Sequence, residues 1–136
     1  MAKVNTVLGQ ISADELGATL IHEHLALGYL GWECDAMAPP YDREAAINTC
    51  VKALQEAKAY GLKTLVDATA SDIGRDIELQ KTVSERLGIN IICVTGMYTE
   101  RYGKPGYLKF RSQVYDITAE VCETYVKEIT QGIGNT

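Results

Sequence analysis

The chain has 136 residues, of which 46% are hydrophobic and 23% charged, a composition typical of one globular domain with its own core. A net charge of −5 argues against a nucleic-acid-binding protein, which would carry a basic face. The sequence has no apolar run of about 18 residues that could span a membrane, and Met1–Asn5 lacks the apolar core of a signal peptide. We therefore expect a single module over residues 1–136, located in the cytoplasm, without nucleic-acid or membrane partners.

The cysteines are spread along the sequence and form no CxxC pair. They are Cys34, Cys50, Cys93 and Cys122. The last three lie inside apolar patterns, where a free cysteine behaves as a small hydrophobic residue. We expect reduced structural thiols rather than disulfides or metal ligands, which fits a reducing compartment.

Strand-forming side chains around a central glycine in residues 4–11 predict a small β-hairpin or cap. The next apolar stretch, residues 19–27, contains the only two histidines of the chain, His22 and His24. This stretch is typical of a short buried strand, on which side chains at i and i+2 point to one face. His22 and His24 are therefore expected on one face and Glu23 on the other.

Two neutral imidazoles about 6–7 Å apart along a strand can bind a single divalent metal ion. The spacing of His22 and His24 thus indicates half of a metal site. Histidines that only pack within the strand are the alternative, because a site normally needs three or four ligands.

After a loop over residues 28–41, apolar residues at helical spacing predict a helix over residues 43–60. Asp42 is a good N-cap for this helix, and Gly61 ends it. The short apolar run over residues 64–68 is typical of a strand buried on both faces of a parallel sheet.

The alternation of helix and strand continues with a predicted helix over residues 74–87 and a predicted strand over residues 89–94. Residues 96–115 are expected to form a long loop rich in Gly, Tyr and Lys. A last helix, beginning at Asp116 or Thr118, is expected to bury one apolar face. The members of that face are Cys122, Tyr125, Val126 and Ile129.

Strands and helices in this order form βαβ units, and therefore a parallel sheet with right-handed crossovers. The expected fold class is α/β, with three βα units after a short N-terminal β-hairpin. Three units cannot close an eight-stranded barrel, which normally needs about 200–250 residues.

Four motifs occur in an order that resembles one known family: His22-Glu23-His24, Val66-Asp67, Asp72–Asp76 and Val94–Tyr98. Together they resemble the N-terminal part of the phosphotriesterase family, in the metal-dependent amidohydrolase superfamily, which includes the phosphotriesterase-like lactonases. The resemblance extends over residues 4–133. It implies that the chain forms the first three βα units of a TIM (β/α)8 barrel that is incomplete here.

The resemblance also implies a binuclear metal centre at the carboxyl ends of the strands, usually with zinc, although iron, cobalt or manganese are possible. His22 and His24 would bind one of the two metals. A carboxylated lysine, further histidines and an aspartate from later strands would complete the centre. Because no match to these ligands precedes Thr136, we expect the chain to be a fragment cut just before its fourth strand.

Three residues are candidate substrate contacts, two of them at positions that match the family. Tyr98 stands where lactonase-type members have a tyrosine that faces the metal centre, and it is the candidate catalytic residue that orients or contacts the hydroxide. This match favours lactones over phosphotriesters. Ile73 matches an apolar wall of the family's substrate pocket, and Leu27, just beyond the histidines, is the candidate for another wall. For each of the three, simple packing is the structural alternative.

Three polar residues near the second strand are expected to have supporting roles. Asp72 is predicted to be an N-cap and Arg75 a member of a structural ion pair. Asp67 ends the strand on the catalytic side and is a candidate hydrogen-bond acceptor behind the metal ligands, rather than a ligand itself.

The resemblance implies a hydrolase in which metal-activated hydroxide attacks a lactone or phosphotriester, and a homodimer for the full-length protein. The alternative is a truncated or degenerate, non-catalytic module that folds partly or self-associates through its exposed strand edge. In both cases the 136-residue chain alone is expected to be inactive.

Overall fold

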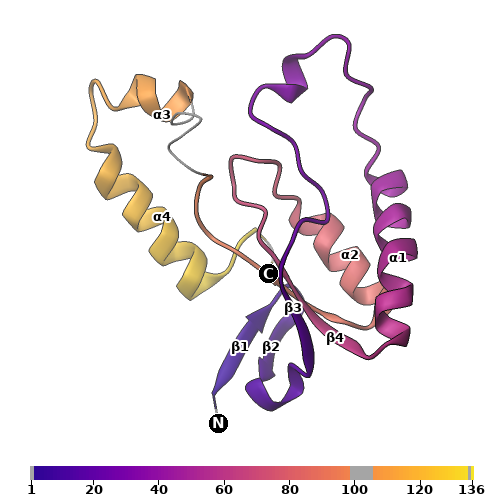
Figure 1. The fold of residues 1–136 in the computed structure, drawn as a ribbon. Helices are drawn as coiled ribbons and strands as arrows, with labels where there is room; N and C mark the ends of the chain where they lie inside the picture. Colours follow the sequence, from indigo (N-terminus) through magenta and orange to yellow (C-terminus); the bar gives the residue numbers. More distant parts are fainter. Residues whose placement is uncertain (1, 99–105, 135) are drawn as a thin grey trace.

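A computed structural model describes residues 2–98, 106–134 and 136 of the chain (Figure 1). The strands are β1 Lys3–Thr6, β2 Gly9–Ser12, β3 Ala18–Glu23, β4 Leu62–Asp67 and β5 Asn90–Cys93. The α-helices are α1 Arg43–Ala59, α2 Ile77–Leu87, α3 Gly106–Arg111 and α4 Ile117–Gln131, and short 3-10 helices cover Ala13–Glu15 and Trp32–Cys34.

The central feature is a three-stranded parallel sheet in the order β3-β4-β5. Helix α1 connects β3 to β4 and α2 connects β4 to β5, as parallel strands require crossover connections. All three strands therefore end at the same edge of the sheet. The predicted α/β fold is confirmed, and in the described part of the chain the sheet is not closed into a barrel.

The N-terminal hairpin is also confirmed, with β1 and β2 paired antiparallel from Lys3 opposite Ser12 to Thr6 opposite Gly9. Its turn residue Val7 is 1% exposed and belongs to the hydrophobic core. The Val7 N–H donates to the carbonyl oxygen of Ile91 in β5 at 2.9 Å. The hairpin is thus attached to the sheet at the end opposite the carboxyl ends of the strands (Figure 1).

Helices α1 and α2 lie side by side over one face of the sheet (Figure 1). Ile47 and Cys50 of α1 and Leu79, Val83 and Leu87 of α2 are buried in one cluster with the strands. Burial of each such aliphatic side chain stabilises the fold by about 1.5–3 kcal/mol. The predicted helix and its cap are confirmed, since the Asp42 side chain accepts a hydrogen bond from Ala45 N at 3.0 Å.

The prediction that the second helix begins at Gly74 is wrong. Residues 71–74 form a turn in which Gly74 has φ +89°, a conformation outside the helical region. Asp76 is the N-cap of α2 and accepts from Leu79 N at 3.1 Å. Asp72 is therefore not an N-cap, and its carboxylate accepts from Tyr98 N at 2.8 Å.

The last helix is confirmed as α4, but its predicted burial is wrong. Cys122 is exposed, and Val126 and Ile129 are 54% and 60% exposed. The physical reason is its position, because α4 stands away from the sheet and approaches it only at its carboxyl end (Figure 1). No sheet strand or helix of the described chain covers the apolar face that the sequence pattern identifies.

The stretch predicted as a loop over residues 96–115 contains helix α3, so that prediction is wrong in its second half. Residues 99–105 lie outside the described residues. In α3 the guanidinium of Arg111 stands 5.2 Å from the ring centroids of both Tyr107 and Tyr115, and it forms an ion pair with Glu120 at 2.7 Å. These contacts stabilise a short helix that hydrophobic spacing does not indicate.

All four cysteines are free thiols in the structure, and their reduced state stays a prediction. Cys50 is buried and Cys93 is partly buried, whereas Cys34 and Cys122 are exposed. Burial raises the pKa of the Cys50 and Cys93 thiols, which disfavours their reactive thiolate form. None of the described helices is both long enough and apolar enough to cross a membrane.

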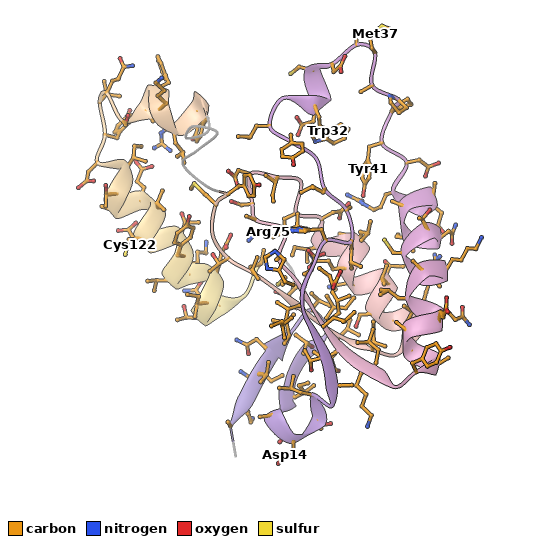
Figure 2. The ribbon with its side chains drawn as sticks, viewed as in Figure 1. Asp14, Trp32, Met37, Tyr41, Arg75 and Cys122 are labelled. Atoms are coloured by element: carbon orange, nitrogen blue, oxygen red, sulfur yellow. The ribbon has the colours of Figure 1, made fainter. Side chains whose placement is uncertain are left out.

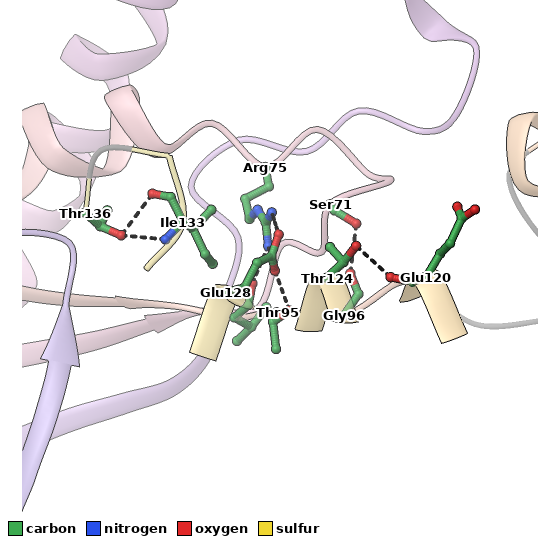
Figure 3. Close-up of polar contacts among 10 residues, drawn as sticks. Ser71, Arg75, Thr95, Gly96, Glu120, Thr124, Glu128, Ile133 and Thr136 are labelled. Atoms are coloured by element: carbon green, nitrogen blue, oxygen red, sulfur yellow. Dashed lines mark hydrogen bonds and ion pairs between the residues drawn. The ribbon is translucent and has the colours of Figure 1, made fainter. Parts of the chain in front are cut away.

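The predicted ion pair of Arg75 is confirmed and connects α4 to the loop after β4 (Figure 3). The guanidinium donates to both carboxylate oxygens of Glu128, at 2.6 and 3.0 Å, and to the carbonyl oxygen of Val94 at 2.9 Å. Thr95 also donates to Glu128. The two charged side chains are only 10% and 15% exposed, so solvent screens this pair weakly.

Replacing Glu128 with Gln removes the negative charge from this pair. We expect the free energy of unfolding to fall by about 2 kcal/mol near neutral pH, because Arg75 loses its charged partner. Hydrogen bonding to Arg75 holds the pKa of Glu128 below its usual value. The stabilisation is therefore complete above the unfolded-state pKa of about 4.3 and is lost as the pH falls through the lower folded-state value. Urea unfolding at several pH values measures both effects.

The matched control is Glu123→Gln on the exposed surface of the same helix, which should change the free energy of unfolding by less than about 0.5 kcal/mol. A stability difference between wild type and Glu128→Gln that stays constant down to about pH 3 would contradict this assignment.

Candidate metal centre

The two histidines lie at the carboxyl end of β3, His22 within the strand and His24 immediately after it. Their ring centroids are 5.4 Å apart and the ring planes meet at 79°. The pairing with β4 shifts between Leu20 and Glu23, so the strand is irregular where the histidines occur. The two imidazoles are thus close enough to approach one ion.

The expectation of a buried histidine strand is wrong. Ile21 is 78% exposed, and both His22 and His24 are exposed. The reason is that β3 is an edge strand of the described sheet, with β4 as its partner on one side. The imidazoles are therefore accessible to a ligand.

His24 is held by a residue of the segment that follows the neighbouring strand. Its Nδ1 lies 3.0 Å from the hydroxyl oxygen of Thr69, which follows β4 and is fully buried. The same hydroxyl lies 3.3 Å from the carbonyl oxygen of Ala26. Sequence reasoning did not identify Thr69; the signal available was its position two residues after Asp67, where an aspartate side chain often bonds the backbone.

Asp67 lies behind this contact and is 1% exposed. Its carboxylate accepts from Thr69 N at 2.9 Å, from the side-chain amide of Gln80 at 3.0 Å and from Leu25 N at 3.4 Å. The Cys50 thiol donates to the Leu25 carbonyl oxygen at 3.1 Å. Asp67 is thus the buried acceptor that the sequence suggested, and it fixes the turn that follows the histidines.

The loops after the three strands contact one another at this edge. The Tyr98 ring meets the Tyr29 ring edge to face, with centroids 6.4 Å apart, which joins the loops after β5 and β3. Ser71 N and the Ser71 hydroxyl both donate to the Gly96 carbonyl oxygen, at 3.2 and 3.0 Å (Figure 3). The loops that follow the three strands therefore form one connected layer at the carboxyl edge of the sheet.

The candidate substrate residues differ in accessibility. Tyr98 is 38% exposed and Leu27 is 48% exposed, whereas Ile73 is 2% exposed. The backbone of Ile73 contacts the loop after β3, since its carbonyl oxygen accepts from Gly28 N at 3.0 Å. The substrate roles of Tyr98, Leu27 and Ile73 stay predictions.

A cavity of about 490 Å³ adjoins Leu27, between the loop after β3 and the start of α2. The rings of Trp32 and Tyr41 meet edge to face beside it, with centroids 6.0 Å apart (Figure 2). The Tyr41 hydroxyl and the Arg43 guanidinium donate to Asp76 at 3.0 and 2.7 Å. Burial and the hydrogen bond to Asp76 raise the pKa of Tyr41 to about 12, so this hydroxyl stays protonated near neutral pH.

As a metal site, the described chain offers two imidazoles. Nowhere in residues 2–98, 106–134 and 136 do three or more His, Cys, Asp or Glu side chains come together as a complete ligand set. His22 and His24 are thus two candidate ligands that lie together, and their role as half of a metal site stays a prediction.

Comparison with known proteins identifies the family. The Phosphotriesterase family profile matches residues 2–136. The chain belongs to the phosphotriesterase family. An organophosphorus hydrolase from Deinococcus radiodurans has a similar structure, with 40% sequence identity and a TM-score of 0.91 over 98% of this chain. A mutant PTE-like lactonase from the same organism has a TM-score of 0.89 and 39% identity over 97% of this chain.

Curated relatives carry several hydrolase names. An aryldialkylphosphatase of Saccharolobus solfataricus is 31% identical over 93% of this chain, and an N-acetyltaurine hydrolase of Xenopus tropicalis is 29% identical over 98%. This chain spans 38% and 44% of the lengths of these two relatives, and 40% of the length of the Deinococcus hydrolase. It corresponds to the hairpin and first three βα units of the barrel in this family.

Replacing Asp67 with Ala removes the acceptor for three donors, two of which are in buried hydrogen bonds. We expect the free energy of unfolding to fall by at least about 2 kcal/mol, because buried donors without a partner are costly. The amide hydrogens of Leu25 and Thr69 should also exchange faster with solvent. Denaturant unfolding and hydrogen exchange by NMR measure the two effects.

Asp14→Ala is the control, because Asp14 is an exposed aspartate in the turn that follows the hairpin (Figure 2). If Asp67→Ala and Asp14→Ala had equal stability and equal amide exchange at Leu25 and Thr69, the buried network would not hold this turn.

Proposed function

We propose that the chain supplies the first metal-binding half-site of a metal-dependent hydrolase. The observation that carries this proposal is the pair of exposed imidazoles, 5.4 Å apart at the carboxyl end of the first sheet strand, in a member of the phosphotriesterase family. Active sites of TIM-barrel enzymes lie at this end of the strands.

The donor set fits a divalent transition metal, with zinc as the proposed ion and iron, cobalt or manganese as alternatives. Imidazole nitrogen is a favoured ligand for these ions. The His24 ring is oriented from behind by Thr69, as is usual for histidines that bind metals. When bound, such an ion acts as a Lewis acid toward water and toward the phosphoryl or carbonyl oxygen of a substrate.

The proposed substrates are lactones and phosphotriesters. This choice is supported by the names of similar proteins, which include an organophosphorus hydrolase and a PTE-like lactonase. Tyr98 favours lactones through its match to the lactonase-type members. Its ring is partly exposed in the loop layer above the strand ends, where it is available to orient a substrate.

The alternative proposal concerns the 136-residue chain by itself, as a non-catalytic module that self-associates. It is supported by large apolar side chains on its surface. These include Ile21, Phe110, Val114, Val126 and Ile129, each at least half exposed. Analytical ultracentrifugation measures whether the chain self-associates, and an esterase assay measures whether it is catalytic. A monodisperse monomer that hydrolyses esters would contradict the alternative proposal.

The hydrolase proposal is tested in a chimera in which this chain replaces the matching segment of the Deinococcus hydrolase, of which it covers 40%. We expect the chimera to retain about two zinc ions per chain and to hydrolyse lactones, phosphotriesters or both. His22→Ala combined with His24→Ala should abolish hydrolysis and lower the zinc content, because both imidazole ligands are lost. Elemental analysis and assays with a lactone, a phosphotriester and N-acetyltaurine provide the measurements.

Asp14→Ala in the same chimera is the control and should leave zinc content and hydrolysis unchanged. Full zinc content and full activity in the double histidine variant would overturn the proposal.

A further inference from the structure

We infer that Thr69 is a positioning residue that fixes the tautomer of His24 and so directs the Nε2 atom of that ring toward the metal. The inference rests on the proposed function, which makes His24 a ligand. The hydrogen bonds around the Thr69 hydroxyl determine which of the two ring nitrogens of His24 is available for binding.

The Thr69 hydroxyl has one proton and two candidate partners. Its oxygen lies 3.0 Å from His24 Nδ1 and 3.3 Å from the Ala26 carbonyl oxygen. A carbonyl oxygen can only accept, so the contact with Ala26 needs the hydroxyl proton. The contact with His24 then needs a proton on Nδ1, which donates to a lone pair of the hydroxyl oxygen. If the hydroxyl instead donates to His24 Nδ1, the oxygen atoms of the Thr69 hydroxyl and the Ala26 carbonyl face each other without a proton between them.

A neutral imidazole with its proton on Nδ1 carries its lone pair on Nε2. In the described chain, His24 Nε2 has no hydrogen-bond partner, and the side chain is exposed. The nitrogen that can bind a metal ion is therefore the accessible one.

Thr69 is itself held in place, which makes it able to select a tautomer. It is 0% exposed, and its N–H donates to Asp67, whose other carboxylate oxygen accepts from Gln80 in α2. Its buried position and its fixed backbone place the hydroxyl at a defined point beside the ring. The ring of His24, just after β3, is thus oriented by a residue that follows β4 and is supported through Asp67 by α2.

The test uses nitrogen NMR on the uniformly labelled, metal-free chain at about pH 8.5, where an ordinary histidine is neutral. We expect His24 to be mainly Nδ1–H in the wild type and in Thr69→Ser, which keeps the hydroxyl. Thr69→Val keeps the volume and removes the hydroxyl, so His24 should shift toward the Nε2–H form that histidine favours in water. His22 forms no hydrogen bond with the Thr69 hydroxyl and serves as the internal reference. The inference would be overturned if His24 were mainly Nε2–H in the wild type, or if its tautomer were unchanged in Thr69→Val. If Thr69→Val does not fold, the spectra of the wild type and of Thr69→Ser decide between the two tautomers.

Zinc titration of the chimera separates this inference from the proposed function. Thr69→Val should weaken zinc binding by about 10- to 100-fold, with near wild-type binding in Thr69→Ser. A tautomer that shifts in Thr69→Val without any loss of zinc affinity would overturn the positioning role. If the wild-type chimera binds no zinc while the NMR result is as expected, the metal centre is refuted and the selection of the tautomer by Thr69 is supported.

Discussion

The buried carboxylate of Asp67 is the interaction on which the carboxyl edge of this sheet depends. It accepts from the backbone of the turn after β3, from the backbone of the residue after β4 that contacts His24, and from a side chain of α2. A nearly inaccessible acceptor of this kind must be matched by donors, because an unpaired buried carboxylate is costly. Its three partners come from separate segments, so it fixes their relative positions and places the histidines at a defined point on the edge.

Much of this architecture could be predicted from the sequence, because it depends on local chemistry. Asp42 caps α1 as expected, the alternating apolar segments form parallel strands, and the hairpin forms at the N-terminus. The spacing of His22 and His24 correctly indicated two imidazoles that lie together. Each of these features was indicated by a pattern within a few residues along the chain.

The features that could not be predicted depend on partners far apart in the sequence. His24 and Thr69 are 45 residues apart, and nothing in either local pattern indicates that they meet. The apolar spacing of α4 suggested a buried face, yet burial needs a surface to pack against, and Val126 and Ile129 are both more than half exposed. The start of α2 was misplaced because Asp72 and Asp76 are equivalent as N-caps in sequence, and only the turn containing Gly74 distinguishes them.

The central claim is that His22 and His24 bind one metal ion together, each through a nitrogen that the fold leaves accessible. Its most direct test is a crystal structure of the zinc-loaded chimera, with the metal located by anomalous scattering. We expect a zinc ion about 2.0–2.1 Å from the Nε2 atom of His24 and from a ring nitrogen of His22. Zinc that occupies the chimera without contacting both rings, or that binds His24 through Nδ1, would contradict the account.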